Sequence, residues 1–141
     1  MVERMSGYAV IAKVSNKTSE LVSLAIVDKL KPMAVRVKTL TFDNGKEFAG
    51  HTYIDEQLQS TAYFGRPFAS WERGSNENLK GLLRQYVPKK RAMSTVTDEE
   101  IRMIQNRLNN RPRKRLGFKT PAECFINHSS ALRFELESTL Y

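Results

Sequence analysis

In the first part of the chain, apolar residues occur first as a continuous strand-like run and then at the spacing of a helix. Residues 7–14 (GYAVIAKV) are β-branched and apolar, and a turn-prone Ser-Asn-Lys sequence follows, so we predict a strand. Apolar side chains then recur at helical spacing up to Leu30, and Thr18 or Ser19 can cap the start of that helix. Pro32 cannot continue the helix, because it lacks a backbone donor.

A second strand-like run, residues 34–42, ends at Asp43 in an Asp-Asn-Gly turn sequence. Residues 46–59 predict a helix, and residues 60–64 predict a third short strand. Strands that alternate with helices in this way favour a sheet layered with helices, which is the α/β class.

The second half of the chain predicts helices separated by loops. Residues 65–74 contain Gly and Pro and predict a loop, and residues 74–86 predict an amphipathic helix. Thr97 and Thr120 each stand three residues before a glutamate, the pattern of a capping box, and predict the starts of two further helices. Residues 128–141 carry no clear pattern, and we assign them to a loose C-terminal tail.

The composition is typical of a soluble globular protein, with 40% hydrophobic and 27% charged residues. A chain of 141 residues fits one domain, which we place at residues 1–127. The single cysteine, Cys124, excludes an internal disulfide and a multi-cysteine zinc site. His51 and His128 are isolated, which favours ordinary histidines over metal ligands. The N-terminus has early charges and no long apolar run, so we expect neither a signal peptide nor a membrane span.

Positive charge is concentrated in one third of the chain. The net charge is +8, with a pI near 9.8. Residues 66–115 hold thirteen Lys/Arg and five Asp/Glu, whereas the rest of the chain holds ten of each. A concentrated cationic segment attracts nucleic acid by neutralising phosphates and releasing counterions. The alternative is a basic solvated face that only keeps the protein soluble.

Asp43 and Glu77 are the candidate catalytic residues. Asp43 ends a strand, where ligands gather in open α/β sheets, and Glu77 lies on the first turn of a later helix. Two Mg²⁺ ions about 3.5–4 Å apart need several carboxylates that converge from different elements. Each residue also has a structural interpretation: Asp43 can cap its own turn, and Glu77 can pair with Lys80.

Helical geometry places Glu77 opposite the apolar stripe of its helix. The core stripe contains Leu79, Leu82, Leu83 and Tyr86. The outward side carries Glu77 together with Lys80, Gly81 and Arg84. In the preceding loop, Trp71 is either a packing anchor or a platform on which a base stacks.

Three strings of the sequence resemble the catalytic domain of bacterial insertion-sequence transposases of the IS-thirty type: TFDNGKEF, YFGRPFASWERGSNENLKGLLRQYVPK and LNNRPRKRLGFKTPAECF. These transposases belong to the retroviral-integrase-like superfamily, and the resemblance runs from Met1 to about Phe125. It implies a ribonuclease-H-like fold with an Asp-Asp-Glu triad. Asp43 matches the second aspartate of the triad and Glu77 the glutamate, whereas Glu72 precedes the helix and does not match.

The resemblance also implies a function, the metal-dependent cleavage of DNA and transfer of the cut strand. Asp43 and Glu77 would each hold one Mg²⁺ or Mn²⁺ ion, and the partners would be transposon ends and target DNA in the bacterial cytoplasm, at the nucleoid. A second copy of the chain or an intact transposase is a further expected partner. The residues that would contact DNA are Arg73, Asn76, Lys80, Arg84, Lys89, Lys90, Arg91, Arg111, Arg113, Lys114 and Arg115.

The first triad aspartate has no counterpart in this sequence. By resemblance it belongs on a strand before Met1, so the first strand and most of the second are absent, as is a helix-turn-helix part. Neither Glu3 nor Glu20 is a convincing replacement. We therefore expect that this chain alone does not catalyse transposition. Because the absent first strand is central in the family, we expect the remaining strands to pair with each other or with a second chain, or else marginal stability.

Two functions from other classes compete with this interpretation. A non-catalytic DNA-binding or oligomerising module, able to interfere with an intact transposase, would bind DNA without needing metal. An unrelated RNA-binding domain would need exposed paired aromatics or a Gly-rich clamp, which the sequence lacks.

Overall fold

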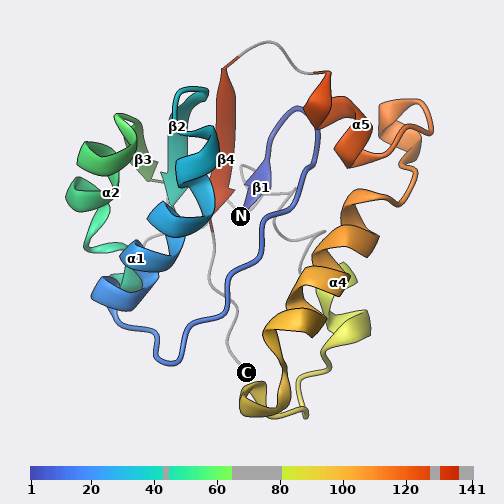
Figure 1. Cartoon of the computed structure of the whole chain (residues 1–141), viewed down its shortest axis with the longest axis horizontal. Helices are drawn as coiled ribbons and strands as arrows, with labels where there is room; N and C mark the ends of the chain where they lie inside the picture. Colours follow the sequence, from blue (N-terminus) through green and yellow to red (C-terminus); the bar gives the residue numbers. More distant parts are fainter. Residues whose placement is uncertain (43–44, 65–80, 128–130, 137–141) are drawn as a thin grey trace.

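A mixed sheet flanked by helices forms the centre of the computed structural model (Figure 1). The structure describes residues 1–42, 45–64, 81–127 and 131–136. The strands of the sheet are β1 (Val2–Glu3), β2 (Val37–Phe42), β3 (Thr61–Phe64) and β4 (Leu132–Leu136). Their spatial order is β1-β4-β2-β3; β3 and β4 run parallel to β2, and β1 runs antiparallel to β4. The predicted α/β class is confirmed.

Helices α1 (Ser19–Leu30) and α2 (His51–Leu58) pack on one face of the sheet (Figure 1). A short 3-10 helix, Lys31–Met33, follows α1, and another, Lys46–Phe48, precedes α2. The main core joins apolar residues of both helices to the inward side chains of β2 and β4. Its fully buried members include Leu30, Leu40, Phe42, Ile54, Leu132 and Phe134.

Helices α4 (Asp98–Asn109) and α5 (Pro121–Ile126) lie beside the sheet (Figure 1). Two 3-10 helices, Met93–Thr95 and Lys114–Leu116, connect this part of the chain. A second core cluster forms around α4 from Val87, Val96, Ile101, Ile104 and Leu108. The described part of the chain thus has two apolar cores, one under the sheet and one around α4.

The predicted strand over residues 7–14 is wrong. Only one isolated bridge, between Val2 and Ala9, forms in this segment. On one edge the segment bonds to the start of the chain: the Val10 N–H donates to the Met1 carbonyl and the Glu3 N–H to the Tyr8 carbonyl, each at 2.8 Å. On the other edge it bonds to α4: Ala9 donates to Asn109 Oδ1 at 2.7 Å, and Asn109 Nδ2 donates back to the Ala9 carbonyl at 2.9 Å. Ile11 donates to Gln105 Oε1 at 2.9 Å. Side-chain amides of α4 therefore take the place of a second neighbouring strand, because they satisfy the backbone groups on the edge that faces away from β1.

The assignment of the last residues to a loose tail is corrected by β4. Leu132–Leu136 occupies the centre of the sheet, between β1 and β2. Leu132 and Phe134 are 0% exposed and Leu136 is 1% exposed. The alternation of apolar and polar residues in Leu-Arg-Phe-Glu-Leu is the signal for a strand, and it was missed because it spans only five residues.

Of the outcomes expected for a sheet that lacks its central strand, the structure shows pairing of the remaining strands with each other. The remaining strands pair with each other, because β4 hydrogen-bonds to β1 on one side and to β2 on the other. The sheet position that the family resemblance gives to a strand before Met1 is thus filled by residues near the C-terminus. Among the residues that the structure describes, β2 is therefore paired on both sides.

Threonine caps begin the helices as predicted. Thr18 accepts from Leu21 at the start of α1, and Thr120 forms a complete capping box with Glu123 at the start of α5. At α4 the box is only half formed. Thr97 accepts from the Glu100 backbone, but the Glu100 carboxylate binds Arg91 instead of the cap.

Candidate functional site

Three parallel strands end together directly before Asp43. Phe42 at the end of β2 is in register with Phe64 at the end of β3 and with Leu136 at the end of β4. In open α/β sheets this carboxyl edge is where ligands bind. The structure therefore places the residue before Asp43 at the edge expected for a site.

The carboxylates and most of the loop residues predicted for the site lie outside the described residues. This holds for both candidate catalytic residues, for the alternatives in the loop before Glu77, and for part of the DNA-binding set: Asp43, Glu77, Trp71, Glu72, Arg73, Asn76 and Lys80. Whether Asp43 and Glu77 converge on a metal stays a prediction. Within the described part of the chain, no group of three or more His, Cys, Asp or Glu residues could hold a metal ion.

The structure reveals a buried carboxylate that the sequence analysis missed. Glu135 on β4 is 4% exposed and lies in register with Thr41, two residues before Asp43. Its neighbours Phe134 and Leu136 point into the core, so Glu135 points to the opposite face of the sheet. The Nε atom of Arg4 lies 3.2 Å from Glu135 Oε1. This ion pair compensates a charge that would be costly to bury alone.

Glu3 on β1 is a second buried carboxylate, with a structural role. It is 0% exposed. Its Oε1 accepts from both the backbone and the hydroxyl of Ser6, each at 2.9 Å, and its Oε2 accepts from the Arg133 backbone at 3.3 Å. These bonds hold the turn after β1 and fix it to β4. That Glu3 does not replace a triad aspartate stays a prediction.

Residues 81–86 form the described part of the predicted amphipathic helix. Leu82, Leu83 and Tyr86 pack against the second core cluster, as the predicted apolar stripe requires. Arg84 lies on the other side of this stripe and is half-buried. Lys89 and Lys90 follow in an exposed turn that the Arg91 N–H closes on the Pro88 carbonyl at 3.0 Å.

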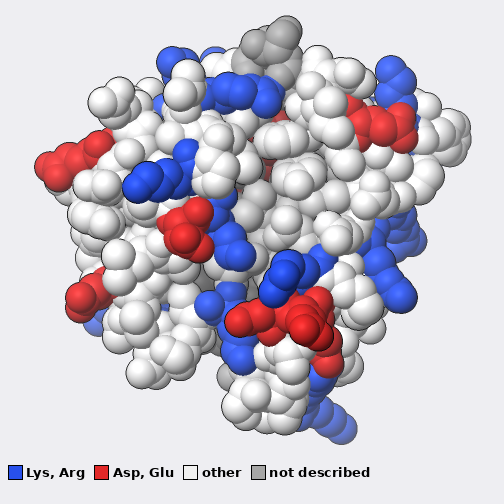
Figure 2. Space-filling view, in the orientation of Figure 1, with Lys and Arg blue, Asp and Glu red and all other residues white. Residues whose placement is uncertain are grey.

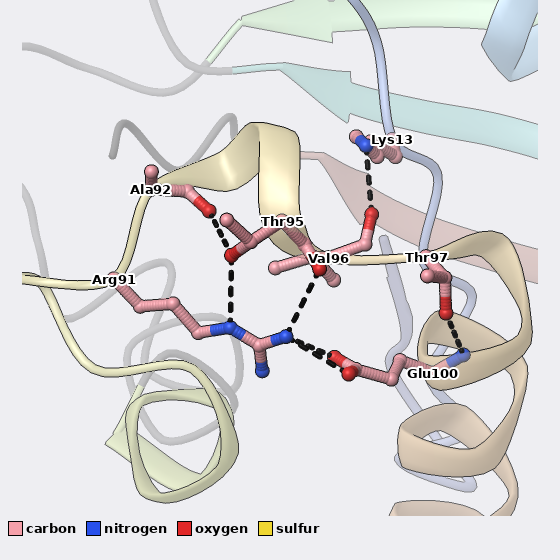
Figure 3. A network of polar contacts seen from close by, with 7 residues as sticks. All are labelled: Lys13, Arg91, Ala92, Thr95, Val96, Thr97 and Glu100. Atoms are coloured by element: carbon pink, nitrogen blue, oxygen red, sulfur yellow. Dashed lines mark hydrogen bonds and ion pairs between the residues drawn. The ribbon is translucent and has the colours of Figure 1, made fainter.

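Arg91 is held by contacts within the protein (Figure 3). Its Nη2 lies 2.8 Å from each carboxylate oxygen of Glu100, and it also donates to the Thr95 carbonyl at 3.1 Å. Its Nε donates to Thr95 Oγ1 at 3.1 Å, and Thr95 in turn donates to the Ala92 carbonyl. The hydrogen bond between the two side chains raises the pKa of Arg91 and lowers the pKa of Glu100. A phosphate at Arg91 would therefore compete with Glu100.

The basic turn, residues 111–119, follows α4 directly. It contains five Lys/Arg and no Asp/Glu. Desolvation lowers the pKa of Arg113, and the like charges of Arg111 and Arg115 lower it further. The Nε atom of Arg113 is buried and has no hydrogen-bond partner among the described residues. The repulsion among these guanidinium groups makes the turn favourable for an anion.

Among the predicted DNA-binding residues that the structure describes, Arg91 and the basic turn lie at opposite ends of α4. Arg91 binds Glu100 in the first turn of α4, and the basic turn follows its last residue. A helix of 12 residues is about 18 Å long, which matches the rise of roughly five base pairs of DNA. Figure 2 shows acidic side chains clustered near the start of α4, whereas Lys and Arg predominate along the edge beside its later part. Arg91 therefore lies near competing carboxylates.

Known transposases share extensive sequence with this chain. The transposase for insertion sequence element IS4351 of Bacteroides fragilis is 47% identical over 131 residues, which are 91% of this chain and 40% of that protein. Transposase InsI for insertion sequence element IS30A of Escherichia coli is 41% identical over 124 residues, 87% of this chain and 32% of that protein. The chain belongs to the insertion-sequence transposase family of the IS-thirty type. The predicted family is confirmed.

Further comparisons place limits on what family membership shows. The transposase for IS1086 of Cupriavidus metallidurans is 36% identical over 87% of this chain and 37% of its own length. The chain thus spans about two fifths or less of these transposases, and no protein-family model matches it. The activity of a whole transposase is therefore a matter for proposal.

A solved structure shares the fold of this transposase-family chain. The catalytic core domain of BIV integrase superposes with a TM-score of 0.63 and 24% sequence identity, over 89% of this chain and 82% of that domain. At this identity the likeness concerns the fold alone. The predicted ribonuclease-H-like, integrase-core fold is confirmed.

Proposed function

We propose that this chain is part of a transposase catalytic core and binds DNA along its basic segments. By family, it is also proposed to bind a divalent metal ion at the end of β2. The 47% identity to the IS4351 transposase over 91% of the chain is the observation that carries the proposal. The integrase-core fold supports it, although a fold by itself would leave the chemistry open. The catalytic-core part is proposed to comprise residues 1–127 together with β4, which lies between β1 and β2 in the sheet.

DNA binding is proposed to depend mainly on the basic turn and on Lys89 and Lys90. These lysines are exposed, and the basic turn has no acidic residue to compete with phosphate. Arg84 is a third proposed contact, whereas Arg91 is proposed to hold its loop through Glu100 before it contacts any phosphate. Phosphate contacts of this kind give affinity and register on DNA, but they do not read sequence.

Salt dependence tests the DNA-binding proposal. The affinity for a short duplex, measured by fluorescence anisotropy, should fall steeply as salt increases, because bound cations release counterions. The double variant Lys89→Gln, Lys90→Gln should weaken binding and reduce the log–log salt slope by about 1 for each phosphate that is no longer neutralised. The matched control is Lys29→Gln, an exposed lysine at the end of α1. Equal losses of affinity in both proteins, or a salt-independent affinity, would contradict the proposal.

The proposed metal ligands are Asp43 and Glu77, with Mg²⁺ or Mn²⁺ as the ion. Carboxylates are the ligands that these hard cations prefer. When bound, the ion would activate a water or hydroxyl for attack on a phosphate. The sequence position of Asp43 supports this role, because Asp43 directly follows Phe42, which lies at the carboxyl edge of three parallel strands. Isothermal titration with Mn²⁺ should give binding that Asp43→Asn removes; unchanged binding in that variant would exclude Asp43 as a ligand.

We also propose that the chain alone does not carry out strand transfer. The sheet position beside β2 is occupied by β4, and the described carboxylate it brings there, Glu135, is engaged by Arg4. A strand-transfer assay with pre-cut transposon ends, in Mg²⁺ and in Mn²⁺, should therefore give no product. Product that disappears in Asp43→Asn would overturn this part of the proposal.

A non-catalytic DNA-binding or oligomerising module is the second candidate. The pairing of the described strands within one chain favours the DNA-binding form of this candidate, because the sheet forms without a second copy. Such a module would bind DNA with the same affinity in EDTA and in Mg²⁺, and would reduce transposition by an intact relative. The catalytic candidate instead predicts tighter DNA binding in the presence of metal. Association with nucleoid DNA in the cytoplasm follows from either candidate as a proposal.

A further inference from the structure

Phe118 is an exposed aromatic side chain within the basic turn. It is 72% exposed, although large apolar side chains are normally buried. Lys114, Arg115 and Lys119 precede and follow it within four residues and are exposed as well. Cations alternating with an exposed ring are the pattern by which proteins hold single-stranded nucleic acid, with phosphates on the cations and a base on the ring.

The backbone of Phe118 is held in an unfavourable conformation. Its φ is +67°, and Gly117 before it has φ +64°. The Lys119 N–H donates to the Leu116 carbonyl at 3.3 Å, so Gly117 and Phe118 are the central residues of a tight turn with two positive φ angles. Such positions favour glycine or asparagine, and a bulky residue there is a true outlier. Outliers of this kind cluster at functional sites.

Hydrogen bonds fix the backbone of the turn that carries the ring. The Phe118 N–H donates to the Arg113 carbonyl at 2.9 Å, and the Arg113 N–H donates to the Lys119 carbonyl at 3.0 Å. The Arg115 guanidinium donates to the Met5 carbonyl at 3.4 Å, which ties the turn to the segment after β1. The ring is therefore presented by a braced turn, so little conformational freedom is lost when a flat partner stacks on it.

We propose that Phe118 stacks on an unpaired DNA base while the neighbouring cations hold the flanking phosphates. The inference rests on the proposed DNA binding and deepens it, because it assigns the basic turn a preference for DNA with an exposed base over an intact duplex. Stacking on a ring tolerates any base, so the turn recognises the unpaired state of the base and reads no sequence.

The test compares two DNAs that differ in one feature, a duplex and the same duplex with a short single-stranded tail that carries 2-aminopurine. The full chain should bind the tailed DNA more tightly, and Phe118→Leu should remove this advantage by a factor of roughly 5 to 150, with little change for the duplex. Phe118→Tyr should keep it. The quenching of 2-aminopurine fluorescence by stacking should be present in the wild type and in Phe118→Tyr, and absent in Phe118→Leu. Tyr53→Leu, an exposed aromatic on α2, is the matched control.

Phe118→Gly separates function from folding. Glycine accepts the positive φ, so this variant should melt no lower than the wild type and yet lose the preference for tailed DNA. A lower melting temperature in Phe118→Gly would show that the ring packs for stability and would overturn the inference. A dimer that Phe118→Leu dissociates, seen by light scattering, would also overturn it, because a second copy would then cover the ring.

The outcomes distinguish this inference from the proposed function. If the wild type binds both DNAs equally, with a steep salt dependence, DNA binding stands and the role of Phe118 fails. If it binds neither DNA, the proposed function fails and the inference fails with it.

Discussion

Removing the Phe134 ring should strongly destabilise the protein, because the structure places this side chain in the centre of the main core. Phe134 is 0% exposed on β4, the strand between β1 and β2. A buried phenylalanine removes about 150–250 Å² from water, and its truncation to alanine typically costs about 3–5 kcal/mol. Domains of this size are stable by only about 5–15 kcal/mol. Phe134→Ala should therefore be marginally folded.

Arg133 offers a matched control on the same strand. Its side chain is exposed, and its backbone N–H, which donates to Glu3 Oε2, is retained in any substitution except proline. Arg133→Ala should thus change the free energy of unfolding by no more than about 0.5 kcal/mol. Urea unfolding followed by circular dichroism gives both values, provided the slope of each transition is unchanged.

The comparison decides between a central strand and a loose tail. If residues 132–136 formed a tail, both variants would unfold at the same urea concentration as the wild type. Equal midpoints for Phe134→Ala and Arg133→Ala would therefore refute the placement of β4 in the sheet. A large loss of stability in both variants would instead indicate that Arg133 packs in a way its exposure does not reveal.

Three further predictions concern single contacts. Asn109→Ala should cost roughly 2–4 kcal/mol in thermal unfolding, because it leaves the buried N–H and C=O of Ala9 without the bonds that Asn109 makes at 2.7 and 2.9 Å. The contribution of the Glu100–Arg91 pair to stability should be fully present above pH 4.5, the ordinary pKa of Glu100. Because the pair lowers that pKa, the contribution should be lost as pH falls below 4.5 and through the lowered pKa, and urea midpoints of Glu100→Gln should lack this change. Thr120→Ala should lower the stability of α5 by about 1 kcal/mol, seen as a lower melting temperature, because the capping box is complete.

Local sequence patterns predicted the elements that depend on local physics. The helix from Ser19 to Leu30, the strand at residues 61–64 and the threonine caps all form, because caps and helical spacing act over a few residues. The strand at residues 34–42 begins only at Val37, since a turn closes with the Val37 N–H on the Ala34 carbonyl. For such elements, prediction and structure differ only in where the element begins.

Elements that depend on distant partners could not be predicted in this way. Residues 7–14 have the composition of a strand, but the backbone donors of Ala9 and Ile11 bind the side chains of Asn109 and Gln105, about a hundred residues away in sequence. The reverse holds for β4. Its five residues carry only a weak strand pattern, and the parallel register with β2 shows that they form a central strand. Composition is a poor guide to strands for this reason, because pairing decides them.

The sheet position beside β2 links the stability of this chain to its chemistry. β4 fills it and buries Phe134, but it also brings Glu135 to the level of Thr41, on the face opposite the main core. Arg4 then neutralises that carboxylate at 3.2 Å. A carboxylate already paired with a guanidinium offers a divalent cation much less attraction than a bare one, since the two positive charges repel each other. The strand that completes the core therefore also sets the charge beside the end of β2, and this packing supports the proposed lack of strand transfer.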